Sequence, residues 1–188
     1  MTPDPVFPDA SASCFEVLGV GASVDDATLS RALRSRLRTW HPDRFGADDE
    51  TLRAEAEWAS ALANDAFRRL ADPFDRAEYL LLLERGVRPD ALKSRVDPEL
   101  FGDMLEIQER CEDLDGTDAP GLRAALESDL VRLERDIAAL ASRLALAFEE
   151  YDAGSTDSAL EAISDVVPVR GYLRRARESV ALRLGLSR

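Results

Sequence analysis

Residues 40–45 read Trp-His-Pro-Asp-Arg-Phe, and this short stretch decides how the first part of the chain folds. His41 is the only histidine in the sequence. Pro42 disfavours the helical conformation at His41, and it cannot extend a helix that arrives from before it. The apolar spacing on both sides predicts two helices joined by a turn. The imidazole of His41 and the carboxylate of Asp43 are therefore expected at the tip of a helical hairpin.

The segment before the tip is predicted to be a helix over about residues 24–40, because apolar residues recur there at helical spacing. Ser23, followed by two aspartates, favours a cap at its start. The other face of this helix carries four arginines: Arg31, Arg34, Arg36 and Arg38. Most charge runs are solvated helix faces. Beside the tip, and in an acidic chain, we interpret this one as a docking surface for an acidic partner.

Two more helices are predicted after the tip. Asp48 or Asp49 can cap the first, whose apolar positions continue to about Ala71. Asp72 followed by Pro73 then marks the start of a new helix, because proline fits the first helical position. These elements together predict a small helical domain built around the hairpin.

The motif His-Pro-Asp between two antiparallel helices resembles the signature of J-domains, the co-chaperone modules that activate DnaK-type ATPases. Two further phrases resemble the HscB family, the iron–sulfur branch of J-proteins: Asn-Asp-Ala-Phe at residues 64–67 and Arg-Ala-Glu-Tyr-Leu-Leu at residues 76–81. The resemblance implies a J-domain over residues 11–88, after a flexible tail at residues 1–10. It also implies a chaperone-binding surface made of His41, Pro42, Asp43, Arg31, Arg34, Arg38 and Arg44. Arg36 departs from the family, since J-domains often have an apolar residue there.

The rest of the chain is predicted to be a linker, residues 89–96, and an antiparallel three-helix bundle, residues 97–188. Loops are expected at residues 115–121 and 152–157. The apolar positions between residues 126 and 148 form a heptad-like seam, which fits either a bundle helix or a homodimeric coiled coil. Pro168 is expected to kink or split the last helix.

The helix that begins after Asp97 has two apolar faces. One is a regular stripe that suits the core of the bundle. Phe101 and Leu105 point away from this stripe, towards acidic residues. They are either buried against the first domain or available to a partner.

In HscB-type proteins the matching helix carries the site for the iron–sulfur scaffold protein, IscU. The resemblance implies that the scaffold-binding residues of this chain are Phe101, Leu105, Glu106, Glu109, Asp113 and, from the last helix, Tyr172. Gly102 stands where the family commonly has a methionine.

Composition narrows the class of protein. The chain has 188 residues and a net charge of −13, which argues against nucleic acid or an anionic membrane as the main partner. Its two cysteines are far apart and predict neither a disulfide framework nor a zinc site. The sequence contains no nucleotide-binding glycine motif and only one histidine, so it predicts no cofactor, no bound metal and no enzyme activity. A signal peptide is not expected either, since no charged start is followed by an apolar segment. A cytoplasmic location is the default expectation.

The resemblance therefore implies a monomeric, all-α co-chaperone of iron–sulfur cluster assembly. It would stimulate a DnaK-type (HscA-like) chaperone and deliver an IscU-like scaffold protein. Two alternatives remain open from the sequence: a J-domain protein with a different client, and a helical adaptor that dimerises through the seam at residues 126–148.

Overall fold

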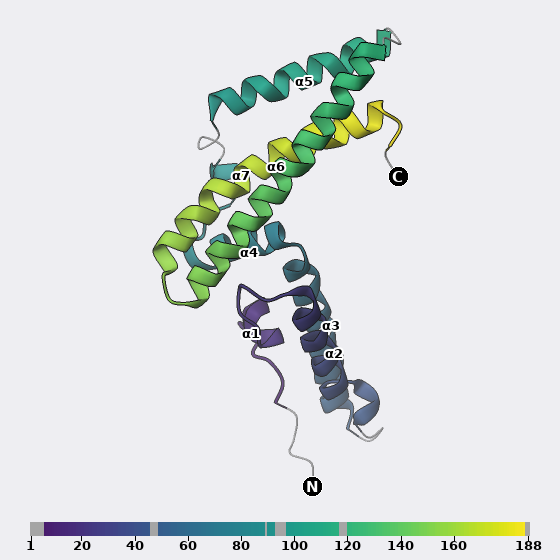
Figure 1. Cartoon of the computed structure of the whole chain (residues 1–188). Helices are drawn as coiled ribbons and strands as arrows, with labels where there is room; N and C mark the ends of the chain where they lie inside the picture. The colour runs from purple at the N-terminus through teal and green to yellow at the C-terminus, as the bar shows by residue number, and fades with distance from the viewer. Residues whose placement is uncertain (1–5, 46–48, 89, 93–96, 117–119, 187–188) are drawn as a thin grey trace. The chain divides into compact units, whose positions relative to one another are not determined.

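The structure is a computed structural model that describes residues 6–45, 49–88, 90–92, 97–116 and 120–186. Within these ranges it contains seven α-helices and no strand (Figure 1), so the predicted all-α class is confirmed. The chain forms two compact units, Met1–Leu83 and Glu84–Arg188. Most of the predicted linker lies outside the described residues, and the domain limits at residues 88 and 97 stay predictions.

The first unit is built on a helical hairpin. Its elements are α1 (Cys14–Leu18), α2 (Asp26–Thr39), the short 3₁₀ turn η1 (Pro42–Arg44), α3 (Glu50–Ala71) and most of α4 (Pro73–Arg85). Helix α3 packs against both α1 and α2. It presents small residues to the core at Ala59, Ala63 and Ala66, which let the neighbouring helices approach closely. Leu29 and Trp40 fill the space opposite them.

Side-chain caps fix where these helices begin. The carboxylate of Asp25 accepts from the backbone N–H of Thr28 at 2.8 Å, so Asp25 rather than Ser23 is the N-cap of α2. The prediction of Ser23 was wrong because the first helical residue is Asp26, which places the capping position two residues later. Asp49 caps α3 in the same way, with its carboxylate 3.1 Å from the backbone nitrogen of Leu52.

Two residues of the Arg-Ala-Glu-Tyr-Leu-Leu phrase hold the first unit together. Arg76 is buried, and its guanidinium donates to the carbonyl oxygens of Leu70, Ala22 and Val24 at 2.8–2.9 Å. The hydroxyl of Tyr79 accepts from the backbone N–H of Cys14 at 2.9 Å. These bonds join α4 to α1 and to the loop that leads into α2, so the phrase has a structural role in the hairpin domain.

The second unit is a three-helix bundle, made of α5 (Pro98–Gly116), α6 (Pro120–Asp152) and α7 (Thr156–Arg183). Helix α6 packs along α7, and α5 contacts both (Figure 1). The loop expected at residues 115–121 is shorter than predicted, since α5 continues to Gly116 and α6 begins at Pro120. Proline and glycine there suggested a loop, but proline is well suited to the first position of a helix. Residues 117–119 lie outside the described part.

The heptad-like seam of α6 is buried inside this bundle. Its members Leu126, Leu133, Leu140, Leu144 and Phe148 are all buried. They are covered by the chain's own helices, while Leu130 and Ile137 of the same seam are partly buried, so most of the seam is already used inside the bundle and is not open to a homodimeric coiled coil.

The last helix is not split, because α7 runs from Thr156 to Arg183 with Pro168 inside it. The proline is itself buried in the bundle. Four residues earlier, the hydroxyl of Ser164 donates to the carbonyl of Leu160 at 2.7 Å. The predicted split is therefore wrong, and burial of the proline in the bundle is consistent with a continuous helix, while the kink stays a prediction.

Candidate functional sites

The first candidate site is the tip of the hairpin. His41 precedes η1, and its Nδ1 accepts from the backbone N–H of Asp43 at 3.2 Å. In a neutral imidazole this places the ring proton on Nε2, which becomes the donor that a partner would meet. A carboxylate oxygen of Asp43 lies 3.7 Å from the same Nδ1, and the two side chains are 56% and 88% exposed. The tip therefore displays a donor and a carboxylate side by side in water.

The tip is held rigidly from the side that precedes it. Trp40 is 2% exposed, and its indole Nε1 donates to the carbonyl of Val6 at 3.2 Å. The carbonyl of Trp40 accepts from the hydroxyl of Ser60 on α3 at 2.9 Å. The sequence predicts a loose tail over residues 1–10, and Val6 makes this contact from within that segment. Residues 1–5 lie outside the described part.

The side that follows the tip is also anchored. The rings of Phe45 and Phe7 contact each other with centroids 6.0 Å apart. Arg44, expected at the chaperone surface, donates from its guanidinium to the carbonyl of Arg38 at 2.8 Å. Arg44 therefore braces the turn against the end of α2, in addition to any contact with a partner.

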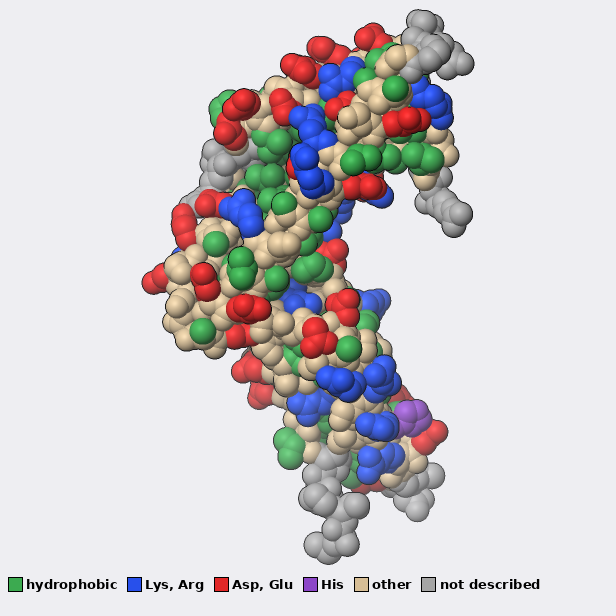
Figure 2. All heavy atoms as spheres, viewed as in Figure 1, with side chains coloured by type: hydrophobic (Ala, Val, Ile, Leu, Met, Phe, Trp, Pro, Cys, Tyr) green, Lys and Arg blue, Asp and Glu red, His purple; other side chains and the backbone are tan. Residues whose placement is uncertain are grey.

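The arginines of α2 divide into two groups. Arg31, Arg34 and Arg38 are exposed and lie three and four residues apart, which places them on one helix face. Arg36 is only half-exposed, because its guanidinium packs over the Trp40 ring at 5.2 Å. It is thus part of the packing around the indole rather than of the exposed stripe. Figure 2 shows arginine side chains gathered beside the histidine.

The second candidate site lies on α5 and α7. Phe101 and Leu105 are 55% and 52% exposed, so this apolar pair is not buried. The ring of Tyr172 on α7 meets the ring of Phe101 edge-on, with centroids 6.3 Å apart and an interplanar angle of 81°. The structure thus brings together the predicted aromatic residues of two different helices. At Gly102, beside them, no atom outside the adjacent residues and the local helix backbone lies within 4 Å of the place a Cβ would take.

Acidic side chains border this apolar patch along α5. Glu109 and Asp113 are exposed. Glu106 is exposed too, but it pairs with Arg110 at 3.8 Å. Arg110 also bonds Asp129 of α6 at 2.9 Å. Glu106 thus belongs to an ion-pair network between α5 and α6 as well as to the predicted docking face.

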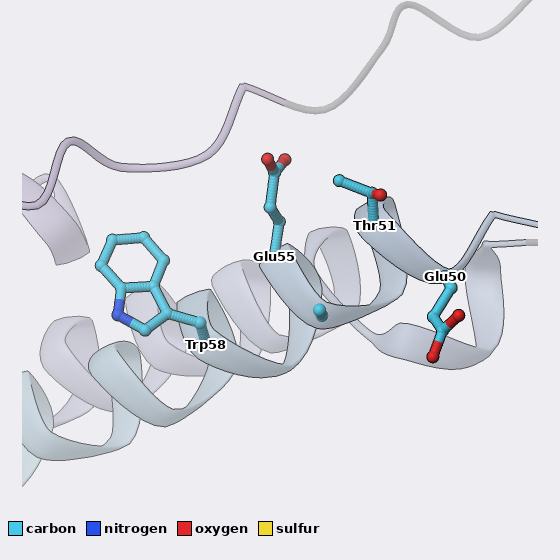
Figure 3. A pocket seen from close by; sticks show the side chains of 5 residues that line it. Glu50, Thr51, Glu55 and Trp58 are labelled. Atoms are coloured by element: carbon cyan, nitrogen blue, oxygen red, sulfur yellow. The ribbon is translucent and has the colours of Figure 1, made fainter.

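A hollow on the outside of α3 does not involve either candidate site (Figure 3). It is lined by Glu50, Thr51, Ala54, Glu55 and Trp58. All of these come from a single helix, so the hollow is open to water and does not enclose a substrate. Within the described ranges, no group of three or more histidine, cysteine or acidic residues is arranged to hold a metal ion. Each helix described is too short or too polar to span a bilayer.

Comparisons of sequence and of structure both find similar proteins that are named HscB. The chain is 36% identical over 159 residues to a protein named co-chaperone protein HscB homolog from Burkholderia thailandensis, which covers 82% of this chain and 86% of the relative. The fold of this chain is similar to that of chaperone HscB from Vibrio cholerae, with a TM-score of 0.68 and 24% sequence identity. The match covers 90% of this chain and 96% of the Vibrio chain. The human co-chaperone protein HscB gives a TM-score of 0.66 at 23% identity, over 94% and 84% of the two chains. No family model matches the chain.

Proposed function

The chain belongs to the HscB family of co-chaperones, and from this premise we propose that it couples a DnaK-type chaperone to an iron–sulfur scaffold protein. The first unit would stimulate the ATPase of an HscA-like chaperone. The second would bind an IscU-like scaffold and deliver it. Binding both partners at once raises the local concentration of the client at the chaperone, so the protein needs no chemistry of its own.

The tip supports the chaperone half of this proposal. Its two flanks are anchored by Trp40 and Phe45, so few degrees of freedom are lost when a partner binds. His41 and Asp43 offer a donor and a carboxylate to the partner's polar groups. The arginine stripe of α2 would speed the encounter and orient the chaperone.

The observation that carries the scaffold half is the half-exposed pair Phe101 and Leu105. The bundle has its own buried apolar stripe, so packing within α5 does not account for this second pair. Burying one such side chain on a partner contributes about 1.5–3 kcal/mol relative to leaving it in water. Two of them, next to Tyr172, supply an apolar centre with an acidic rim, which is the usual anatomy of a protein interface.

The test is steady-state ATP turnover by the cognate DnaK-type chaperone, with and without the scaffold protein. His41→Gln is expected to abolish stimulation. A Phe101→Ala/Leu105→Ala double variant is expected to keep basal stimulation and lose the extra stimulation that the scaffold provides. A Val131→Ala/Leu146→Ala double variant is the matched control, because it removes comparable apolar side chains that are exposed on α6.

Gly102 favours a second candidate function, a J-domain protein with another client. Glycine there removes apolar contact area from the docking face. Stimulation by the wild type to which the scaffold adds nothing would select this candidate. Absence of any stimulation, with an active chaperone, would rule out both.

A further inference from the structure

Arg175 lies directly beside the proposed scaffold site, and the sequence analysis does not single it out. Its guanidinium packs over the ring of Tyr172, 4.9 Å from the ring centroid. The edge contact with Phe101 occupies another part of the same ring. Tyr172 therefore connects an exposed cation on α7 to the apolar patch on α5.

The register of the two helices shows where this cation stands. Phe101 contacts Tyr172, and the hydroxyl of Ser179 lies 3.3 Å from the side-chain oxygen of Gln108. From the first pair to the second, the residue number rises by seven on α5 and by seven on α7. The two helices therefore run in the same direction. Arg175 is accordingly level with the turn of α5 that carries Leu105. The apolar patch has carboxylates on α5 beyond it and a guanidinium on α7 beside it.

Two neighbouring arginines of α7, Arg174 and Arg177, have environments that differ from that of Arg175. Arg174 is paired with Glu178 at 3.7 Å, and Arg177 with Glu134 on α6 at 3.2 Å. Arg175 instead rests on an aromatic face with its side chain exposed. Stacking holds the guanidinium in a defined position while its N–H groups can still meet an anion. A pre-positioned guanidinium loses less side-chain freedom when it binds a carboxylate.

We propose that Arg175 is a specificity-determining residue of the scaffold site, where it binds a carboxylate on the iron–sulfur scaffold protein. This inference rests on the proposed function. The site then has both signs of charge around one apolar centre: acidic on α5 and basic on α7. A partner fits only if it places basic groups opposite α5 and an acidic group opposite Arg175 on α7. Arg175 therefore fixes the partner's orientation as well as its affinity.

The test is calorimetric titration of the full-length protein with the IscU-like scaffold at two salt concentrations. Arg175→Glu is expected to weaken binding about tenfold or more, and Arg175→Gln by less. Arg175→Lys should retain part of the affinity, since it keeps the charge and loses the planar stack. Arg174→Glu is the matched control, and its affinity should stay within about twofold of the wild type because that side chain pairs with Glu178 and not with the aromatic ring. The affinity of Arg175→Gln should also depend less on salt than that of the wild type.

Two results would overturn the proposal while the scaffold assignment stands. One is an unchanged affinity in Arg175→Glu when Phe101→Ala/Leu105→Ala abolishes binding. The other is an equal loss in Arg175→Glu and Arg174→Glu, which would show a general effect of surface charge. If the wild type does not bind the scaffold at all, both the proposed function and this inference fail. Circular dichroism of each variant checks that α7 remains folded.

Discussion

At the scale of single residues, Arg76 is the clearest case of a charged side chain used for structure. It is 4% exposed, and it serves three carbonyl oxygens that lie on two separate segments of the first unit. Planar N–H groups in a fixed fork suit this task, because one side chain can reach several acceptors in different directions.

Replacing Arg76 with leucine should therefore destabilise the first unit. The variant leaves buried carbonyl oxygens without these donors, and the expected loss in the free energy of unfolding is about 3 kcal/mol. Urea unfolding followed by tryptophan fluorescence measures this unit selectively, because both tryptophans of the chain, Trp40 and Trp58, lie within it. Arg76→Lys should recover only part of the loss.

The control is Arg53→Leu, which changes an exposed arginine of α3 and should shift the free energy of unfolding by less than about 0.5 kcal/mol. Equal effects of the two leucine variants would contradict the structural role of Arg76.

The sequence revealed some of these residues and not others, for a physical reason. His41 and Asp43 could be assigned to the tip because Pro42 constrains the local backbone. The roles of Arg76 and Arg36 depend on carbonyls and rings that are distant in sequence, so helical periodicity alone does not show them. Arg175 was missed for a related reason, since only the arrangement in space shows that its guanidinium covers an aromatic ring.

At the scale of elements, Glu84 and Arg85, the first residues of the second unit, are bonded to the helices α6 and α7 of that same unit. Tyr151 at the end of α6 donates from its hydroxyl to the carboxylate of Glu84 at 2.7 Å. Arg85 pairs with Glu161 of α7 at 3.3 Å. Burial, then the hydrogen bond to Glu84 and its negative charge, raise the pKa of Tyr151 from 10.0 to about 12.

The raised pKa predicts a loss of stability at high pH. Unfolded Tyr151 ionises near pH 10, whereas the folded residue keeps its proton to about pH 12. Its contribution to the stability of the second unit is therefore fully present below pH 10 and disappears as pH rises through 12. The near-ultraviolet absorbance of tyrosinate, compared between wild type and Tyr151→Phe, should show this phenol titrating near pH 12. Ionisation of Tyr151 near pH 10 would contradict the hydrogen bond to Glu84.

Element boundaries were predicted well where a cap or a proline acts locally. Asp72 and Pro73 marked the start of α4, and α3 ends at Ala71 as expected. Of the two outcomes predicted for Pro168, a split is wrong, because α7 continues through the buried proline. The kink stays a prediction.

At the scale of the whole molecule, the burial of the α6 seam affects whether the protein can form a homodimer. The seam that would have supported a coiled-coil dimer is covered within the chain, at residues that include Leu133, Leu144 and Phe148. Exposed apolar side chains do occur on α6, at Val131 and Leu146, but fifteen residues of helix put them about 22 Å apart. Isolated apolar residues on a surface are common and do not by themselves form an interface.

The protein is therefore expected to be a monomer in solution. Sedimentation equilibrium over a wide range of concentrations should give a single species of 20.7 kDa. A stable dimer would contradict this expectation, and one that survives the Val131→Ala/Leu146→Ala substitutions would have to use a surface other than these exposed apolar residues of α6.

At Gly102, finally, a substitution can change the apolar area of the docking face without disturbing the fold of the bundle. No atom outside the adjacent residues and the local helix backbone lies within 4 Å of the place where its Cβ would stand, and the residue is exposed on a helix. A side chain there meets no steric obstacle, and alanine in place of glycine favours a helix by roughly 1 kcal/mol. If the proposed function holds, the residue at position 102 can therefore change the affinity for the client while the architecture of the bundle stays the same.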